Sequence, residues 1–131
     1  MSKPLTAEEF PLYWAKLIND GRLEDVISLY HENIVLMPTF SPKTIRDEAG
    51  VRDYFVQLAA RKGLNVKLHE NTVNSVSMGN DKFAVNGIYS FEFELEGAML
   101  SFPARFTFVI DLTDEHPIAH HHSSQIPRTL S

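Results

Sequence analysis

The fold is decided by the stretch Ala104-Arg105-Phe106-Thr107-Phe108-Val109-Ile110-Asp111-Leu112, followed after a short connection by Ile118-Ala119-His120-His121-His122-Ser123-Ser124. Apolar side chains alternate strictly in the first run, so that one face carries Ala104, Phe106, Phe108, Ile110 and Leu112, and the other carries Arg105, Thr107, Val109 and Asp111. The polar residues 113–116 between the runs are typical of a hairpin loop. We therefore expect two antiparallel strands, one with an arginine and one with a histidine cluster, that form the polar wall of a cavity.

The hairpin register decides which histidines lie beside Arg105. A four-residue loop that pairs Leu112 with Pro117 places His120 and His122 there. A three-residue loop that pairs Leu112 with His116 instead places His121 and Ser123 there, because a slip of one residue moves every side chain to the other face. The residues alone leave both registers open.

Composition restricts the class of protein. At 131 residues, with 44% hydrophobic and 11% aromatic content, the chain is expected to form a single domain over residues 1–131. A net charge of −5 argues against nonspecific binding to nucleic acid or to an anionic membrane, and the lack of cysteine excludes disulfides and cysteine metal sites. The N-terminal Met1-Ser2-Lys3-Pro4-Leu5 has no signal-peptide core and no stretch reaches transmembrane length, so we expect a cytoplasmic protein. No motif calls for a cofactor.

The upstream residues show helical spacing first and strand alternation afterwards. Thr6 and Glu9 have the spacing of a capping box, and an apolar stripe follows it, formed by Phe10, Tyr13, Trp14, Leu17 and Ile18. Further elements are expected as helices at 23–30 and 47–62, a short strand at 34–37, and long strands at 66–78, at 83–95 and from 99 onward. Three helices before a four-stranded antiparallel meander predict an α+β fold, in which a strongly curved sheet covered by helices forms a cone with an internal pocket.

Several segments carry a family resemblance when they are taken together. They are the stripe with Trp14, Asn19-Asp20-Gly21 leading into Leu29-Tyr30, Met37-Pro38-Thr39-Phe40-Ser41, Ala104-Arg105-Phe106-Thr107, and His120-His121-His122-Ser123-Ser124. Nearly the whole chain resembles the bacterial relatives of the association (hub) domain of calcium/calmodulin-dependent protein kinase II, within the SnoaL-like, NTF2-like superfamily. The resemblance implies a cone-shaped fold and assembly through the sheet. It does not imply a kinase, because the chain has no kinase glycine-rich loop or catalytic-loop motif.

The resemblance also implies a set of ligand-binding residues. Arg105 matches a pocket arginine of the association domains, and its guanidinium would bind a carboxylate, although an internal ion pair or simple exposure is equally open from the residues alone. Tyr89 and Ser123 stand where the kinase domain carries two further basic residues, which weakens the anion preference. The resemblance favours the register that brings His121 to Arg105, and Phe55 lies on the helical lid. We expect a homo-oligomer whose internal pocket binds a small, carboxylate-bearing molecule.

Two other functions stay open at this point. One is an enzyme of the isomerase or cyclase type that uses a pocket histidine as general acid or base. Asp53 is the best-placed acid, but its helical phase points it to solvent. The other is a pure oligomerisation module, since function varies widely within one fold.

Two further expectations concern metal and assembly. His120 and His122 share a strand face and could be metal ligands, but no motif announces a third ligand, so we expect a metal-free site. If Arg105 points inward, then Phe106 and Phe108 lie on the outer face with Ile110. An exposed apolar patch of that kind would mark a subunit interface.

Overall fold

The computed structural model describes residues 6–127, and the N-terminal segment that was expected to lack a signal peptide, residues 1–5, lies outside this range. The helices and strands are α1 (Phe10–Asn19), α2 (Leu23–Ser28), β1 (Tyr30–Met37), α3 (Glu48–Ala59), β2 (Asn65–Ser77), β3 (Lys82–Leu95), β4 (Ala98–Asp111) and β5 (Ile118–Gln125). Among the helices in this range, none is long and apolar enough to cross a membrane.

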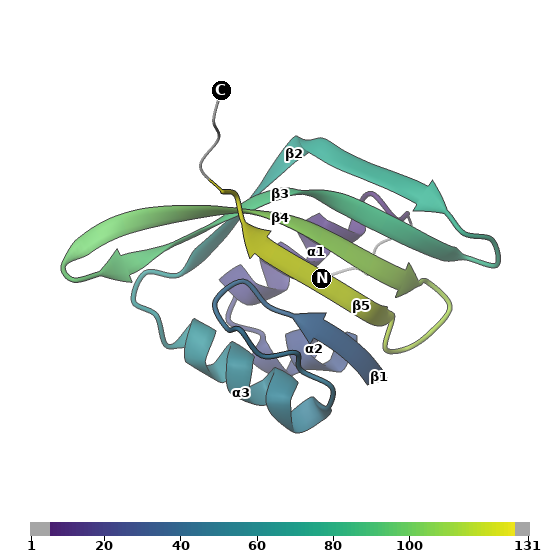
Figure 1. Cartoon of the computed structure of the whole chain (residues 1–131), viewed down its shortest axis with the longest axis horizontal. Helices are drawn as coiled ribbons and strands as arrows, with labels where there is room; N and C mark the ends of the chain where they lie inside the picture. Colours follow the sequence, from purple (N-terminus) through teal and green to yellow (C-terminus); the bar gives the residue numbers. More distant parts are fainter. Residues whose placement is uncertain (1–5, 128–131) are drawn as a thin grey trace.

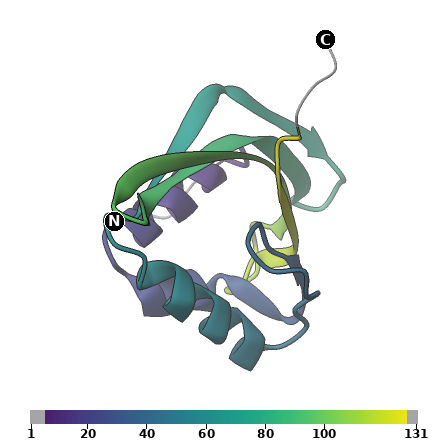
Figure 2. The same cartoon turned by 60° about the vertical axis from the view of Figure 1, so that its left-hand side comes forward.

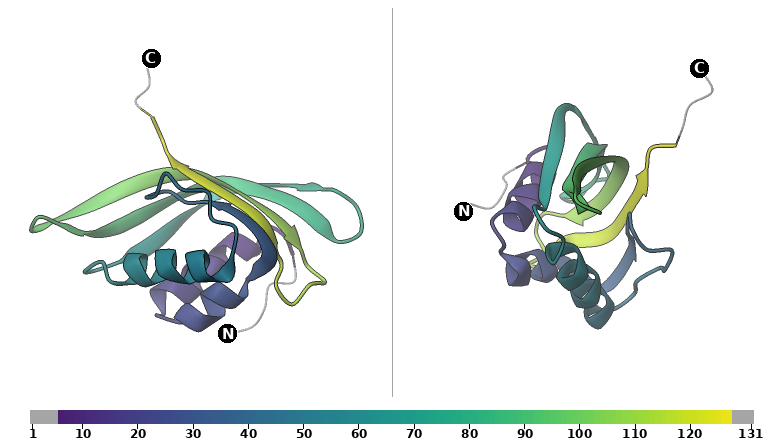
Figure 3. Two further views of the ribbon diagram at one scale, coloured as in Figure 1. Left: turned by 60° about the horizontal axis from the view of Figure 1, so that its bottom comes forward. Right: turned by 90° about the vertical axis from the view of Figure 1, so that its left-hand side faces the viewer.

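The strands form one curved sheet with the order β1-β5-β4-β3-β2 (Figure 1). β1 runs parallel to β5, and the other neighbouring strands are antiparallel. The sheet bends around the helices, which lie together on one side of it, and it does not close into a barrel (Figures 2 and 3). The predicted α+β architecture, with helices gathered on one face of the sheet, is confirmed.

The helix starts follow the local sequence signals. Just before α1, the Thr6 hydroxyl accepts from the Glu9 backbone N–H at 3.3 Å, which is one of the two bonds of a capping box, and it donates to the Glu9 carboxylate at 3.0 Å. At the start of α3, the Asp47 carboxylate accepts from the Gly50 backbone N–H at 2.8 Å. This bond satisfies one of the amides that a helix leaves unpaired at its N-terminus.

β1 begins earlier than its sequence predicts. The spacing of Leu23, Val26, Ile27 and Tyr30 favours a helix through Tyr30, but α2 ends at Ser28 and the strand begins at Tyr30. The Ile118 backbone N–H donates to the Leu29 carbonyl at 2.8 Å, and Tyr30 lies opposite Ile118 in the parallel pairing. A contact with a strand far along the chain therefore overrides the local helical preference.

The apolar face of β4 packs inward against the helices. Phe106, Phe108 and Ile110 are 2%, 0% and 1% exposed, so the prediction that they form an outer patch is wrong. The Phe108 ring centroid lies 5.4 Å from that of Phe10 and 5.5 Å from that of Trp14, both on α1. Burying these large apolar side chains is favourable, whereas burying an unpaired guanidinium would cost several kcal/mol, so the arginine face turns outward.

The β4–β5 hairpin combines the two registers that the sequence left open. Next to the loop, Ile110 pairs with Ile118, as the three-residue loop predicts. One residue further from the loop on β4, Val109 pairs with His120, as the four-residue loop predicts. Ala119 is the extra residue between these pairs, and it forms a β-bulge.

The bulge determines which side chains of β5 point into the molecule. Ser123 pairs with Phe106 and His121 pairs with Phe108, so both polar residues share the inner face of the sheet. The predicted placement of His121 and Ser123 beside Arg105 is therefore wrong, because Arg105 pairs with Ser124 and lies on the outer face.

Candidate functional site

A chain of hydrogen bonds crosses the core between α1 and the sheet. The Trp14 Nε1–H donates to the Tyr30 hydroxyl at 3.1 Å. The Tyr30 hydroxyl lies 2.9 Å from His121 Nδ1, and the Tyr89 hydroxyl lies 3.1 Å from His121 Nε2. All four side chains are buried. The imidazole is thus held at both ring nitrogens between two phenols.

The contacts assign the proton of His121 to Nε2. The Tyr30 oxygen accepts from Trp14, and its own hydrogen can be donated to His121 Nδ1. The Nε2–H then donates to Tyr89. The opposite tautomer would leave the Tyr30 hydrogen without an acceptor, which is costly in a buried site.

Burial controls the charge of this chain. Burial, with a smaller contribution from charge repulsion by His120 and His122, lowers the pKa of His121 to about 3. Burial also raises the pKa of Tyr30 and of Tyr89. The imidazole and both phenols are therefore neutral at pH 7, and the group offers hydrogen bonds but no charge.

A small cavity lies beside the hydrogen-bond chain. Its volume is about 10 Å³, room for about one water molecule. The Thr39 and Ser123 hydroxyls, which are hydrogen-bonded to each other, contribute to its wall. The cavity is lined by Trp14, Leu36, Pro38, Thr39, Tyr54, Phe55, Tyr89, Phe91, His121 and Ser123. Four of the five predicted ligand-binding residues, Phe55, Tyr89, His121 and Ser123, thus lie together.

Arg105 is the predicted residue that the structure does not bring to this cavity. Its side chain is exposed on the outer face of the sheet, whereas its neighbours Ala104 and Phe106 point inward. His120 and His122 share the outer face with it. In residues 6–127 no three His, Cys, Asp or Glu side chains are grouped so that they could hold a metal ion. The metal-free site and anion binding by Arg105 stay predictions.

A surface groove adjoins the cavity at Tyr54, which lines both. The groove has a volume of about 300 Å³ and runs between α3 and the loop after β1. It is lined by Phe40, Ser41, Pro42, Lys43, Ile45, Gly50, Asp53, Tyr54, Gln57, Leu58 and Arg61. Asp53, considered as a catalytic acid, is exposed and accepts a hydrogen bond from Gln57 at 3.1 Å, as expected for a solvated helix face.

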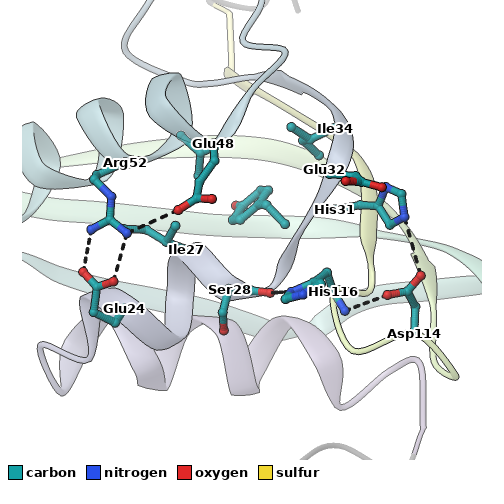
Figure 4. Close-up of a pocket in the computed structure, with 12 residues that line it drawn as sticks. Glu24, Ile27, Ser28, His31, Glu32, Ile34, Glu48, Arg52, Asp114 and His116 are labelled. Atoms are coloured by element: carbon teal, nitrogen blue, oxygen red, sulfur yellow. Dashed lines mark hydrogen bonds and ion pairs between the residues drawn. The ribbon is translucent and has the colours of Figure 1, made fainter.

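A larger open cleft, of about 570 Å³, lies between α2, α3, β1 and the β4–β5 loop (Figure 4). Its charged groups bind one another, except that the exposed Glu32 forms no ion pair within residues 6–127. Arg52 forms ion pairs with Glu24 at 2.6 Å and Glu48 at 3.5 Å, and His31 lies 3.6 Å from Asp114. Because these exposed groups already have partners, the cleft presents less unsatisfied polar chemistry to a ligand than its size suggests.

Sequence reasoning missed Tyr30 and Thr39 as site residues. Tyr30 was assigned to the end of a helix, and its hydrogen bond to His121 depends on the parallel pairing of β1 with β5. Thr39 was assigned to a loop, although it belongs to a segment that carries the family resemblance. That segment was the available signal for Thr39, whereas local spacing gave none for Tyr30.

Comparisons with known proteins agree with this architecture. Residues 8–129 match the family described as a SnoaL-like domain. No curated protein matches the chain in sequence.

Solved structures give the same fold. A Xanthomonas campestris protein, described as a candidate calcium/calmodulin-dependent protein kinase II association domain, superposes with a TM-score of 0.79 at 24% identity, over 98% of this chain and 95% of that one. A ketosteroid isomerase-like protein from Erwinia carotovora atroseptica superposes with a TM-score of 0.73 at 14% identity, over 90% and 92%. An NTF2-like protein with a cystatin-like fold from Novosphingobium aromaticivorans gives a TM-score of 0.71 at 12% identity, over 92% and 79%. The resemblance seen in the sequence is confirmed for the fold.

Proposed function

Since the chain belongs to the SnoaL-like domain family, we propose that it binds a small organic molecule in the cavity beside His121, with a carbonyl or hydroxyl group of that molecule at Ser123 and Tyr89. One observation supports this proposal. Hydroxyl and imidazole groups from four separate segments, namely the loop after β1, α3, β3 and β5, converge on a cavity that has mostly aromatic and aliphatic walls. Apolar walls with a few convergent polar groups are characteristic of small-molecule sites.

The charge of the site favours a neutral group at its inner end. The buried polar residues among positions 6–127 are Ser90, His121 and Ser123, so the described core contains no buried carboxylate, lysine or arginine. With Arg105 on the outer face, the inner end of the cavity has no cation to pair with an acid. Binding also requires the cavity to enlarge, because about 10 Å³ cannot hold an organic molecule.

Fluorescence of Trp14 tests the proposal directly, because it is the single tryptophan and lines the cavity. We expect 3-(4-acetylphenyl)propanamide to quench this fluorescence saturably, and 3-(4-ethylphenyl)propanamide, which lacks the ketone, to bind more weakly. Ser123→Ala should weaken the ketone about fivefold, as the loss of a hydrogen bond of roughly 1 kcal/mol predicts. Ser124→Ala on the outer face is the matched control and should leave binding unchanged.

Arg105→Met separates this proposal from binding at the outer arginine. We expect the variant to fold and to bind the ketone as the wild type does. If Arg105→Met abolishes binding while Ser123→Ala has no effect, the cavity is not the site.

A second candidate function is general acid–base catalysis by His121. It rests on the hydrogen bonds that join the His121 imidazole to the Tyr30 and Tyr89 hydroxyls, because such a chain provides a path for proton transfer. The test is deuterium incorporation at the ketone methyl group of the same probe in D₂O, followed by NMR. Catalysed exchange that His121→Gln abolishes would establish an enzyme, and exchange at the uncatalysed rate would leave a binding protein.

We also propose self-association through the outer face of the sheet. The residues on this face are not the predicted patch of Phe106, Phe108 and Ile110, which is buried. This face carries Thr107, Val109, His120 and His122, and Met37 at the adjacent edge is 38% exposed. Partly apolar side chains there support a contact between copies.

A further inference from the structure

Tyr54 separates the internal cavity from the surface groove. It is the one residue of the described chain that lines both hollows, and its neighbours on α3 divide between them: Asp53 lines the groove and Phe55 lines the cavity. On the opposite side, Thr39 lines the cavity and Phe40 lines the groove. Movement of the Tyr54 ring would therefore join about 10 Å³ of cavity to about 300 Å³ of groove.

The closed position of Tyr54 is held by neutral contacts. Burial, partly offset by hydrogen bonding with the Phe40 backbone and with Thr39, raises the pKa of Tyr54 to about 12. The Tyr54 and Phe55 rings pack edge to face with centroids 5.3 Å apart. These interactions are local to one side chain and one loop, so a ligand can displace the ring without unfolding α3.

The groove carries two cations beside this ring. Lys43 and Arg61 line it, and neither forms an ion pair within residues 6–127. The Arg61 guanidinium lies 5.2 Å from the centroid of the Phe93 ring, which positions it without neutralising its charge. Asp53, the acid that lines this groove, accepts a hydrogen bond from Gln57. The groove thus holds one net positive charge.

We propose that this groove is the mouth of the cavity and that Arg61 and Lys43 bind a carboxylate at the outer end of the ligand. This inference rests on the proposed function, and it names the ligand class more closely. The ligand is an elongated acid with a carbonyl or hydroxyl group at the inner end and an apolar body between Trp14, Phe55 and Phe91. Tyr54 swings aside when it enters.

The experiment compares 3-(4-acetylphenyl)propanoic acid with its primary amide, which has nearly the same shape but no charge. We expect wild type to bind the acid about fivefold more tightly, the factor that roughly 1 kcal/mol of exposed ion pairing provides. The double variant Lys43→Gln with Arg61→Gln should bind acid and amide equally. The control Lys67→Gln with Arg105→Gln removes the same charge from other exposed positions and should keep the preference for the acid.

Tyr54→Ala provides an independent readout. Without the ring, association of both probes measured by stopped-flow Trp14 fluorescence should be faster, whereas Tyr54→Phe should change it less.

The outcomes separate this inference from the proposed function. If wild type binds acid and amide equally, the mouth does not recognise a carboxylate, although the cavity still binds the ketone. If the preference for the acid disappears in the Lys67→Gln, Arg105→Gln control and persists in the Lys43→Gln, Arg61→Gln variant, the carboxylate does not bind in the groove and the inference is wrong. If neither probe binds, both proposals fall.

Discussion

Lowering the pH should destabilise the protein through His121. In the unfolded chain an imidazole has a pKa of about 6.5, whereas burial lowers the pKa of the native residue to about 3. Between these values the unfolded state binds a proton that the native state does not bind, so the free energy of unfolding falls as the pH falls. At pH 5, about 1.5 units below the unfolded pKa, the loss is roughly 2 kcal/mol at about 1.36 kcal/mol per unit.

Urea unfolding at pH 7 and pH 5 measures this effect, and His121→Gln provides the comparison. Glutamine has a donor and an acceptor for Tyr30 and Tyr89 but does not titrate in this range. The wild type should lose about 2 kcal/mol more than the variant between the two pH values. Equal losses would show that His121 titrates normally and would refute its burial as a neutral imidazole. An NMR titration of the wild-type His121 ring provides the same test without a variant.

Three further predictions concern the fold and assembly. Asp47→Ala should reduce the free energy of unfolding by about 1 kcal/mol in urea titrations, because it removes the cap of α3, and no change would show that the cap contributes nothing. Arg52→Met should lower the free energy of unfolding only slightly, and this effect should disappear in high salt, because the partners Glu24 and Glu48 are highly exposed; a large, salt-independent loss would contradict this. Light scattering at micromolar concentration should detect a dimer or a larger assembly, and a monomer would remove the proposed interface on the outer face of the sheet.

Much of the fold could be predicted because its signals are local. The apolar spacing around Trp14 and the strict alternation from Ala104 gave the first helix and a long strand with nearly correct bounds. The α+β class followed from the order of these elements. Family resemblance brought Tyr89 into the predicted site, whereas Phe55 was predicted there from the apolar spacing of the third helix.

The errors arose where a long-range contact decides the structure. Alternation shows that Arg105 and Phe106 lie on opposite faces of β4 but does not show which face meets the helices. The bulge at Ala119 joins two registers that were treated as alternatives. The role of Tyr30 depends on parallel pairing with a strand near the end of the chain, for which local propensity contains no information.

A crystal structure of the protein with 3-(4-acetylphenyl)propanoic acid tests the central claim most directly. The proposed function predicts density for the ketone oxygen within hydrogen-bond distance of Ser123 or Tyr89, with the Tyr54 ring displaced from its closed position. Density for the probe in the open cleft beside Arg52, with the cavity still closed by Tyr54, would contradict the claim.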